Sequence, residues 1–237
     1  MAIQKSSGTN QDSNIKLSVI VTCYNYGSFL TRCLRSLILQ TLDPSTYEII
    51  VVDDCSSDSS EEIAKAFLEF HGKNQPLITY IRNDVNLGVA ASSNVGISNS
   101  KGKYFVRIDA DDYVNKNMLY IMTEYLDQNQ EILCVSCDYI HVNDDEMKIK
   151  RFYAEKDPIS CGIMYYKSKL NELGLYNPDW RHREEEELRK RLGCEYKIDH
   201  LRFPFYRYRM HSSNKTKSES EMSYFKELLT DVKPIVS

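Results

Sequence analysis

The sequence lacks the features that mark several protein classes. No apolar run approaches the roughly 20 residues that a membrane-spanning helix needs. The first fourteen residues are polar and lack the apolar core of a secretory signal. The formal net charge of −4 shows no basic excess that would favour nucleic acid as a partner. We therefore expect a disordered leader at residues 1–14, and a cytoplasmic protein with no transmembrane segment and no nucleic-acid partner.

Cysteine is present, but without the pairing that a disulfide or zinc framework requires. Seven cysteines, an odd number, argue against disulfides and favour a reducing compartment. Cys134 and Cys137 have C-x-x-C spacing, yet no second pair of this kind and no nearby pair of histidines follows. Both lie in a run that reads as a strand, so we expect them to be buried thiols.

The first half of the chain alternates strand and helix patterns. Apolar, β-branched runs predict strands at residues 17–22, 47–52, 77–81 and 104–109. Helical stripes of apolar residues separate each strand from the next. This alternation predicts an α/β fold with a Rossmann-like, mostly parallel central sheet and helices on both faces.

The second half is less regular. We expect helices at residues 117–127 and 183–193, and strands at 131–142, 160–166 and 196–208. Residues 147–153 are expected to pair back onto the strand at 131–142. Residues 216–237 are expected to form a C-terminal helix and tail that docks on the body rather than on a membrane. We find no repeat, low-complexity segment or clear linker, which favours one domain over residues 15–215.

Carboxylates follow the strand at residues 104–109. Asp109 and Asp111 are two residues apart, so in an extended chain they point to the same side and repel each other unless a cation lies between them. Oxygen ligands on a short loop suit Mg²⁺ or Mn²⁺, whereas capping of the next helix is the alternative. Polar residues also follow the first and second strands. The carboxyl ends of parallel strands meet at one edge of a sheet, so this edge is the expected ligand site.

The helix at residues 183–193 begins with four consecutive glutamates. A solvated acidic face is one interpretation, helped by the preference for acids at a helix N-terminus. By spacing, Glu184 and Glu185 lean toward the buried stripe, whereas Glu186 points away and is expected to pair with Lys190. A carboxylate that leans inward is a candidate general base, because partial burial raises its pKa.

These motifs together resemble the inverting glycosyltransferase family 2, which has the nucleotide-sugar-binding GT-A fold. The resembling segments are residues 18–25, 51–58, 86–88, 94–96, 102–104 and 109–112, with a looser likeness over residues 162–214. Cys23 stands where the family usually has proline, and Cys55 where glycine is common. The resemblance implies a nucleotide-binding half at residues 15–115 and an acceptor-binding half with a smaller sheet at residues 116–215.

The resemblance also implies roles for individual residues. A Mn²⁺ or Mg²⁺ ion would be held by Asp109, Asp111 and His211, although a surface position for His211 is the alternative. Glu185 matches the catalytic base, with Glu184 and Glu186 as alternatives because the family usually has Asp there. The residues expected to close over the diphosphate are Arg207, Arg209 and Lys215. The expected nucleotide-binding residues are Thr22, Tyr24, Asn25, Asp53, Asp54, Arg82, Asn86, Gly88, Asn94, Asp109 and Ala110.

The implied activity is metal-dependent, inverting transfer of a sugar from a nucleotide-diphosphate donor, expected to be UDP-linked, to an acceptor hydroxyl. The expected acceptor is a saccharide or lipid-linked saccharide in surface polysaccharide or glycoconjugate synthesis, which leaves peripheral membrane association open. A sugar nucleotidyltransferase is one alternative, but it needs a glycine-rich, basic phosphate loop, and residues 23–28 contain no basic residue. The other alternative is a non-catalytic nucleotide-sugar-binding module of the same fold.

Overall fold

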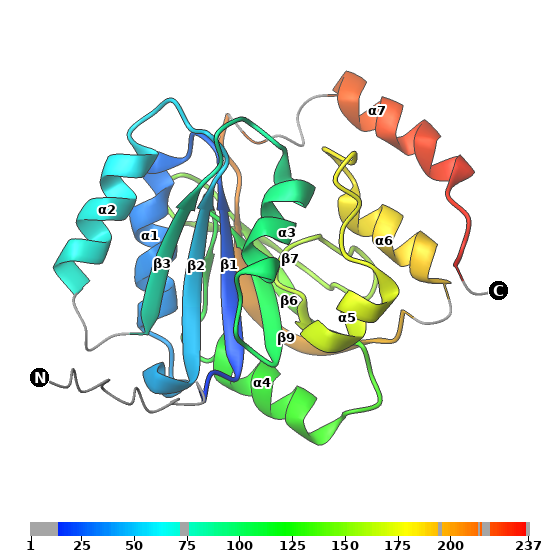
Figure 1. Ribbon diagram of the computed structural model, residues 1–237, viewed down its shortest axis with the longest axis horizontal. Helices are drawn as coiled ribbons and strands as arrows, with labels where there is room; N and C mark the ends of the chain where they lie inside the picture. The colour runs from blue at the N-terminus through cyan, green and yellow to red at the C-terminus, as the bar shows by residue number, and fades with distance from the viewer. Residues whose placement is uncertain (1–13, 72–75, 194–195, 213, 215–218, 236–237) are drawn as a thin grey trace, which may run out of the picture.

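The structure is a computed structural model (Figure 1) that describes residues 14–71, 76–193, 196–212, 214 and 219–235. The expected leader, except its last residue, and Lys215 lie outside these ranges. Within them, no helix has the length and apolar character required to cross a membrane.

The described elements follow the expected alternation in the first half of the chain. The strands are β1 (Leu17–Cys23), β2 (Tyr47–Asp53), β3 (Leu77–Arg82), β4 (Tyr104–Asp109), β5 (Tyr113–Val114), β6 (Cys134–Val142), β7 (Lys148–Phe152), β8 (Met164–Tyr166) and β9 (Ile198–Arg209). The helices are α1 (Gly27–Ile38), α2 (Ser60–His71), α3 (Val89–Ser98), α4 (Met118–Gln128), α5 (Lys167–Leu173), α6 (Glu184–Leu192) and α7 (Glu219–Leu228). Short 3₁₀ turns, η1 (Pro44–Thr46) and η4 (Leu229–Asp231), complete the set.

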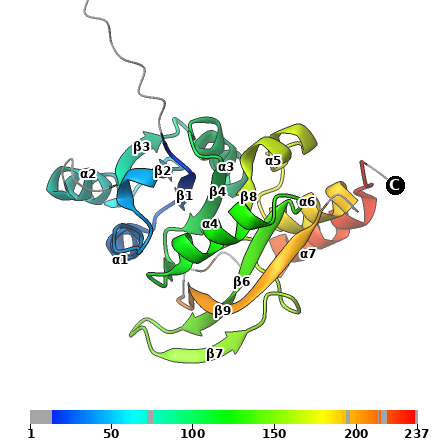
Figure 2. The same cartoon turned by 90° about the horizontal axis from the view of Figure 1, so that it is seen from below.

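The described strands form one sheet in the order β3-β2-β1-β4-β8-β6-β9-β5, with β7 paired to β6. Figure 2 shows β3, β2, β1, β4 and β8 following one another across the molecule. The strands β3, β2, β1 and β4 are parallel, which confirms the mostly parallel sheet expected for the first half. The strand β8 runs antiparallel to both β4 and β6. The smaller sheet expected on the acceptor side is therefore continuous with the central sheet through β8.

Helices cover both faces of the sheet, because successive side chains of a buried strand point to opposite sides. On β1, Val19 and Val21 face the core shared with α1, α2 and α4, whereas Ile20 faces the core shared with α3, α5 and α6. Both faces are apolar, so these strands read as continuous hydrophobic runs rather than as alternating ones.

The second half departs from the expected boundaries mainly at its strands. The strand β9 is continuous past Pro204, and it pairs in parallel with β6 with register shifts at residues 137–139. The expected pairing of residues 147–153 with the preceding strand is confirmed by the antiparallel pair β6–β7. The helix α7 packs on the body, since the Phe225 ring lies 5.5 Å from the Trp180 ring.

Candidate active site

A cavity of about 400 Å³ lies at the carboxyl ends of β1, β2 and β4, where parallel sheets bind ligands. From the first half it is lined by the ends of these strands and by the start of α3. From the second half it is lined by the loop at residues 158–161, by the segment that precedes α6 and the start of that helix, by β6, by β9 and the residues after it, and by Met222 of α7. The lining residues used below are Thr22, Tyr24, Asp54, Arg107, Asp109, Asp111, Arg181, His182, Arg183, Glu184, Glu186 and Met222.

Asp54 lines the cavity and organises the loop before α3. Its carboxylate accepts hydrogen bonds from the backbone amides of Leu87 and Gly88, both at 2.8 Å, and from the Asn83 side chain at 2.9 Å. Burial opposes ionisation, but these hydrogen bonds outweigh it and lower the pKa of Asp54. Asp54 is therefore a fixed carboxylate at the edge of the cavity.

Asp53 points away from the cavity and supports the same loop from behind. It accepts hydrogen bonds from the Tyr80 hydroxyl and from Arg82, both at 2.6 Å, and from the Ser56 amide at 2.9 Å. Arg82, expected near the nucleotide, is thus held by Asp53 and by the Ser56 carbonyl. Within the described chain, Arg82 is not among the residues that line the cavity.

Four further residues expected to bind the nucleotide shape the loops around the cavity. The Asn25 carboxamide accepts a 2.8 Å hydrogen bond from the Ser57 amide, and the Ala110 amide donates to the Thr22 carbonyl. The Asn94 side chain donates to the Tyr176 carbonyl at 2.7 Å. Asn86 is hydrogen-bonded to Arg181 at 2.9 Å. These contacts join the loops that carry the lining residues.

The strand β4 places two charged side chains on the cavity wall. Arg107 and Asp109 are two residues apart and lie on one side of the strand, with an Nε–Oδ1 distance of 3.3 Å. The Thr22 hydroxyl of the neighbouring β1 donates to Asp109 at 3.2 Å, because the two residues are paired in the strand register. Burial raises the pKa of Asp109, although the Arg107 charge opposes that shift.

Asp111 lines the cavity and contacts His211, which is buried behind it and is not among the lining residues of the described chain. The Asp111 Oδ2 and His211 Nε2 atoms are 2.9 Å apart, and the His211 amide donates to the Asn214 side chain. Asp111 faces the cavity. An imidazole nitrogen and carboxylate oxygens are suitable ligands for Mn²⁺.

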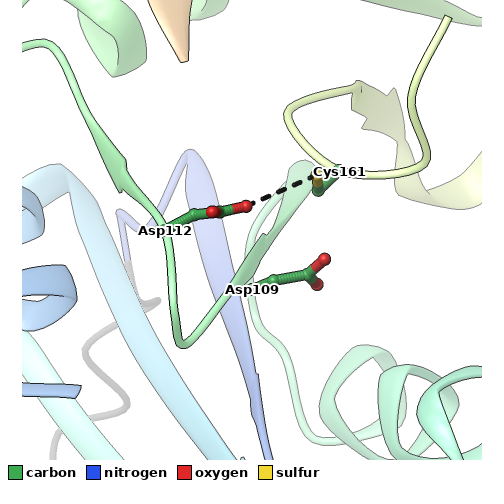
Figure 3. Close-up of side chains that lie close together, drawn as sticks. All are labelled: Asp109, Asp112 and Cys161. Atoms are coloured by element: carbon green, nitrogen blue, oxygen red, sulfur yellow. Dashed lines mark hydrogen bonds between the residues drawn. The ribbon is translucent and has the colours of Figure 1, made fainter. Parts of the chain in front are cut away.

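A second cluster, Asp109, Asp112 and Cys161, brings its ligand atoms within 4.8 Å of one another (Figure 3). Asp112 already accepts hydrogen bonds from the Tyr206 hydroxyl at 2.7 Å and the Arg209 amide at 2.8 Å. Burial raises the pKa of the Cys161 thiol well above its usual value, which disfavours the thiolate. Asp112 therefore connects the loop after β4 to β9 by hydrogen bonds. Its oxygens are less available to an ion than those of Asp111.

The glutamates at the start of α6 divide into different environments. Glu184 faces the cavity and accepts a 2.8 Å hydrogen bond from Arg107. Glu185 is fully buried away from the cavity, and its Oε1 accepts hydrogen bonds from the Tyr165 and Tyr196 hydroxyls. Burial raises the pKa of Glu185. Of the two residues favoured by the sequence, the structure brings Glu184 to the cavity.

Glu186 also borders the cavity, but the pairing expected for it is wrong. Its carboxylate pairs with Arg183 at 2.7 Å, because Arg183 lies one turn earlier at the start of the helix. Lys190 instead donates to the Leu229 carbonyl.

The arginines expected to close over the diphosphate lie elsewhere in the described chain. Arg207 donates to the Pro204 carbonyl at 2.5 Å, and Arg209 donates to the Asp111 carbonyl at 3.0 Å. Neither is among the residues that line the cavity. The cavity is instead bordered by Arg107, Arg181 and Arg183, which sequence analysis missed. Arg107 carried a usable signal, because an arginine inside the apolar run of β4 needs a buried anionic partner.

Comparison with solved structures identifies the class of fold to which this site belongs. The chain is similar to Staphylococcus aureus TarS 1-349 in complex with UDP-GlcNAc, with a TM-score of 0.74 and 20% identity over 92% of this chain and 66% of that one. It is also similar to mannosyltransferase PcManGT of Pyrobaculum calidifontis in complex with GDP-Man and Mn²⁺, with a TM-score of 0.73 and 16% identity over 92% and 65% of the two chains. The fold is that of the GT-A glycosyltransferases, as the sequence predicted.

The sequence comparisons then identify the family. The family model described as glycosyl transferase family 2 matches residues 18–213. Glycosyltransferase GlyA of Streptococcus pneumoniae serotype 4 is 34% identical over 161 residues, which cover 68% of this chain and 21% of that protein. The poly(ribitol-phosphate) beta-N-acetylglucosaminyltransferase TarS of Staphylococcus aureus is 30% identical over 116 residues, which cover 48% of this chain and 19% of that protein. The chain belongs to glycosyltransferase family 2, and it spans about a fifth of the length of these two relatives.

Proposed function

We propose that the protein is a metal-dependent, inverting glycosyltransferase that transfers a sugar from a UDP-linked donor to an acceptor hydroxyl. The observation that carries the proposal is that Asp111 and Glu184, from opposite halves of the chain, face one cavity. A carboxylate suited to a divalent ion and a carboxylate suited to proton removal are the two groups that such a transfer requires.

The donor is proposed to bind along the edge formed by Thr22, Tyr24 and Asp54, with its diphosphate toward Asp109 and Asp111. Two neighbours of the same fold are in complex with UDP-GlcNAc and with GDP-Man and Mn²⁺. Asp109, Asp111 and His211 are the proposed ligands of Mn²⁺ or Mg²⁺. When bound, the ion takes up the negative charge that develops on the leaving diphosphate.

Glu184 is the proposed general base, in preference to Glu185. Glu184 accepts the proton of the acceptor hydroxyl as that oxygen attacks the anomeric carbon from the face opposite the diphosphate. The bond between the anomeric carbon and the diphosphate oxygen breaks as the new bond forms, which inverts the configuration. Arg107 orients Glu184 through their 2.8 Å contact. Glu185 is less suited to this role, because it is fully buried and is not among the residues of the described chain that line the cavity.

The proposed acceptor is a saccharide or lipid-linked saccharide in the assembly of a surface polysaccharide or glycoconjugate. This proposal is supported by TarS, whose name describes sugar transfer to poly(ribitol-phosphate). The acceptor would enter from the side of the cavity bordered by His182, Arg183 and Met222.

The proposal is tested by thermal shift with UDP, GDP, dTDP and CDP, each with and without Mn²⁺. We expect UDP to stabilise the protein only with Mn²⁺, by ~2.7 kcal/mol at a hundredfold excess over its dissociation constant. Asp111→Asn is expected to remove this stabilisation, whereas the exposed control Asp231→Asn should retain it. Equal stabilisation of Asp111→Asn by UDP and Mn²⁺ would count against the metal site. UDP release from a UDP-sugar then separates an enzyme from a non-catalytic module.

A further inference from the structure

The C-terminal helix α7 reaches the candidate active site, although the expected family motifs end before it. Its Met222 lines the cavity together with residues of β1 and β4. Figure 1 shows α7 beside α6, at the end of the molecule opposite α2. The contacts between these helices explain how a helix near the end of the chain can influence the site.

One group of contacts joins α7 to the segment immediately before Glu184. The Phe225 ring is 9% exposed and lies 5.5 Å from the Trp180 ring and 5.7 Å from the His182 ring. The Arg183 Nε donates to the Met222 carbonyl at 3.1 Å. The helix α7 thus contacts three of the four residues that precede Glu184.

A second group of contacts joins the end of this region to the other end of α6. Lys190 donates to the Leu229 carbonyl of η4. The Ile235 amide donates to the Arg191 carbonyl at 2.7 Å. The segment from α7 to Ile235 therefore contacts both ends of the helix that carries Glu184.

The beginning of α6 needs support from outside the helix. Arg183, its N-cap residue, has a φ of 57°, in the left-handed region that non-glycine residues rarely adopt. Its side chain makes no capping hydrogen bond to the helix. Such a backbone conformation is strained and persists only where the surroundings hold it. The contacts of Arg183 with Met222 and Glu186 are part of those surroundings.

We propose that α7 is a positioning element of the active site, which holds residues 180–184 so that Glu184 faces the cavity and which supplies Met222 to the acceptor-side wall. The proposal rests on the proposed function only for the role of Glu184 as the base. The contacts between α7 and the segment before Glu184 do not depend on that role.

The first test measures amide hydrogen exchange of residues 180–188 in the wild type, Phe225→Ala and Tyr224→Ala. Tyr224 is the comparison, since it is an adjacent aromatic residue on the same helix, is 58% exposed, and has its ring 5.3 Å from that of Phe225, so it tests whether losing a ring beside Phe225 is enough. We expect exchange to become about tenfold faster in Phe225→Ala and to stay at the wild-type rate in Tyr224→Ala. Unchanged exchange in Phe225→Ala overturns the proposal, whether or not the protein is an active transferase.

The second test separates positioning from general stability by measuring hydrolysis of UDP-GlcNAc and UDP-glucose with Mn²⁺. In Phe225→Ala we expect kcat to fall about tenfold while the donor KM changes less than about twofold, because a misplaced base slows the chemical step. Phe225→Leu, which retains apolar packing, is expected to recover most of kcat. Faster exchange with unchanged kcat overturns the positioning role. If the wild-type protein hydrolyses neither donor but exchange is faster in Phe225→Ala, the proposed function is contradicted. The contact between α7 and residues 180–188 is then still supported.

Discussion

The two halves of the chain build their sides of the cavity in different ways. In residues 15–115 the site residues follow parallel strands directly, so the sheet itself brings Thr22, Asp54 and Asp109 to one edge. In residues 116–235 the cavity residues come from loops, a helix start, two strands and a C-terminal helix that are distant in sequence. The first side is set by strand register, whereas the second is set by contacts between separate elements.

This difference indicates where the site tolerates change. A side chain at the end of a central strand is held by the hydrogen bonds of its neighbours on both sides. Glu184 depends instead on Arg107, on the unusual backbone of Arg183, and on the packing of α6 against its surroundings. We expect the acceptor side to be more easily displaced, and the following predictions test that contrast.

The largest effect on the reaction rate is expected for Glu184, the proposed base, which lies in the acceptor-binding half of the chain. Glu184→Gln should lower the rate of sugar transfer or donor hydrolysis about a thousandfold, because it removes the proposed base. UDP affinity, which the proposed function assigns to the first half, should be measured on the same sample and should stay near the wild-type value. Arg107→Met is expected to produce a smaller loss of rate, since it leaves the proposed base in place and removes the cation that contacts both Glu184 and Asp109.

Glu185→Gln is the matched comparison for this prediction. It changes a neighbouring carboxylate that lies outside the cavity, so the turnover rate should fall less than about tenfold. If Glu185→Gln inactivates the protein and Glu184→Gln does not, the assignment of the base is reversed, and the original expectation from the sequence would stand.

An effect of intermediate size is expected from the packing of the first half. A Cβ atom on Gly96 of α3 would lie 2.3 Å from the Ile20 side chain of β1. Gly96→Ala should therefore destabilise the protein by about 2 kcal/mol, although Gly→Ala in an exposed helix interior stabilises by about 1 kcal/mol. Chemical denaturation measures this difference, with the exposed Ser98→Ala on the same helix as a control. A stabilised Gly96→Ala would show that α3 and β1 are not tightly packed.

The smallest effect is a difference in pH dependence between the two halves. The lowered pKa of Asp54 means that its contribution to stability is present above its ordinary pKa of 3.8 and is lost as the pH falls below it. The raised pKa of Glu185 has the opposite sign, so stability falls as the pH rises above its ordinary pKa of 4.5.

Denaturation of two variants between pH 3 and pH 8 checks these signs. Asp54→Asn should lose stability at neutral pH and lose less on acidification than the wild type. Glu185→Gln should lose less stability than the wild type as the pH rises from about 4.5 toward neutral. Parallel pH curves for the wild type and Glu185→Gln would contradict the buried, raised-pKa carboxylate.

Much of the candidate site could be predicted because its residues follow strands. The positions of Thr22, Asp54 and Asp111 at one cavity follow from the alternation of strands and helices. That Asp53 binds Arg82 away from the cavity could not be predicted, because adjacent residues after a strand point in opposite directions and only the folded loops decide which side chains face the cavity. That Arg207 and Arg209 do not line the cavity of the described chain has a similar reason, since the direction of side chains along β9 depends on its register shifts against β6.

The sequence by itself determined the class of fold, the family and the edge of the sheet where the site lies. It did so because hydrophobic periodicity and short motifs are local properties of the chain. Only the tertiary structure decided that Glu184 rather than Glu185 reaches the cavity, and that α7 lies beside α6. Whether Glu184 or Glu185 reaches the cavity depends on the rotation of α6 against its neighbours, because a helix turns about 100° per residue and adjacent side chains face different surroundings. The position of α7 depends on contacts between segments that are distant in sequence.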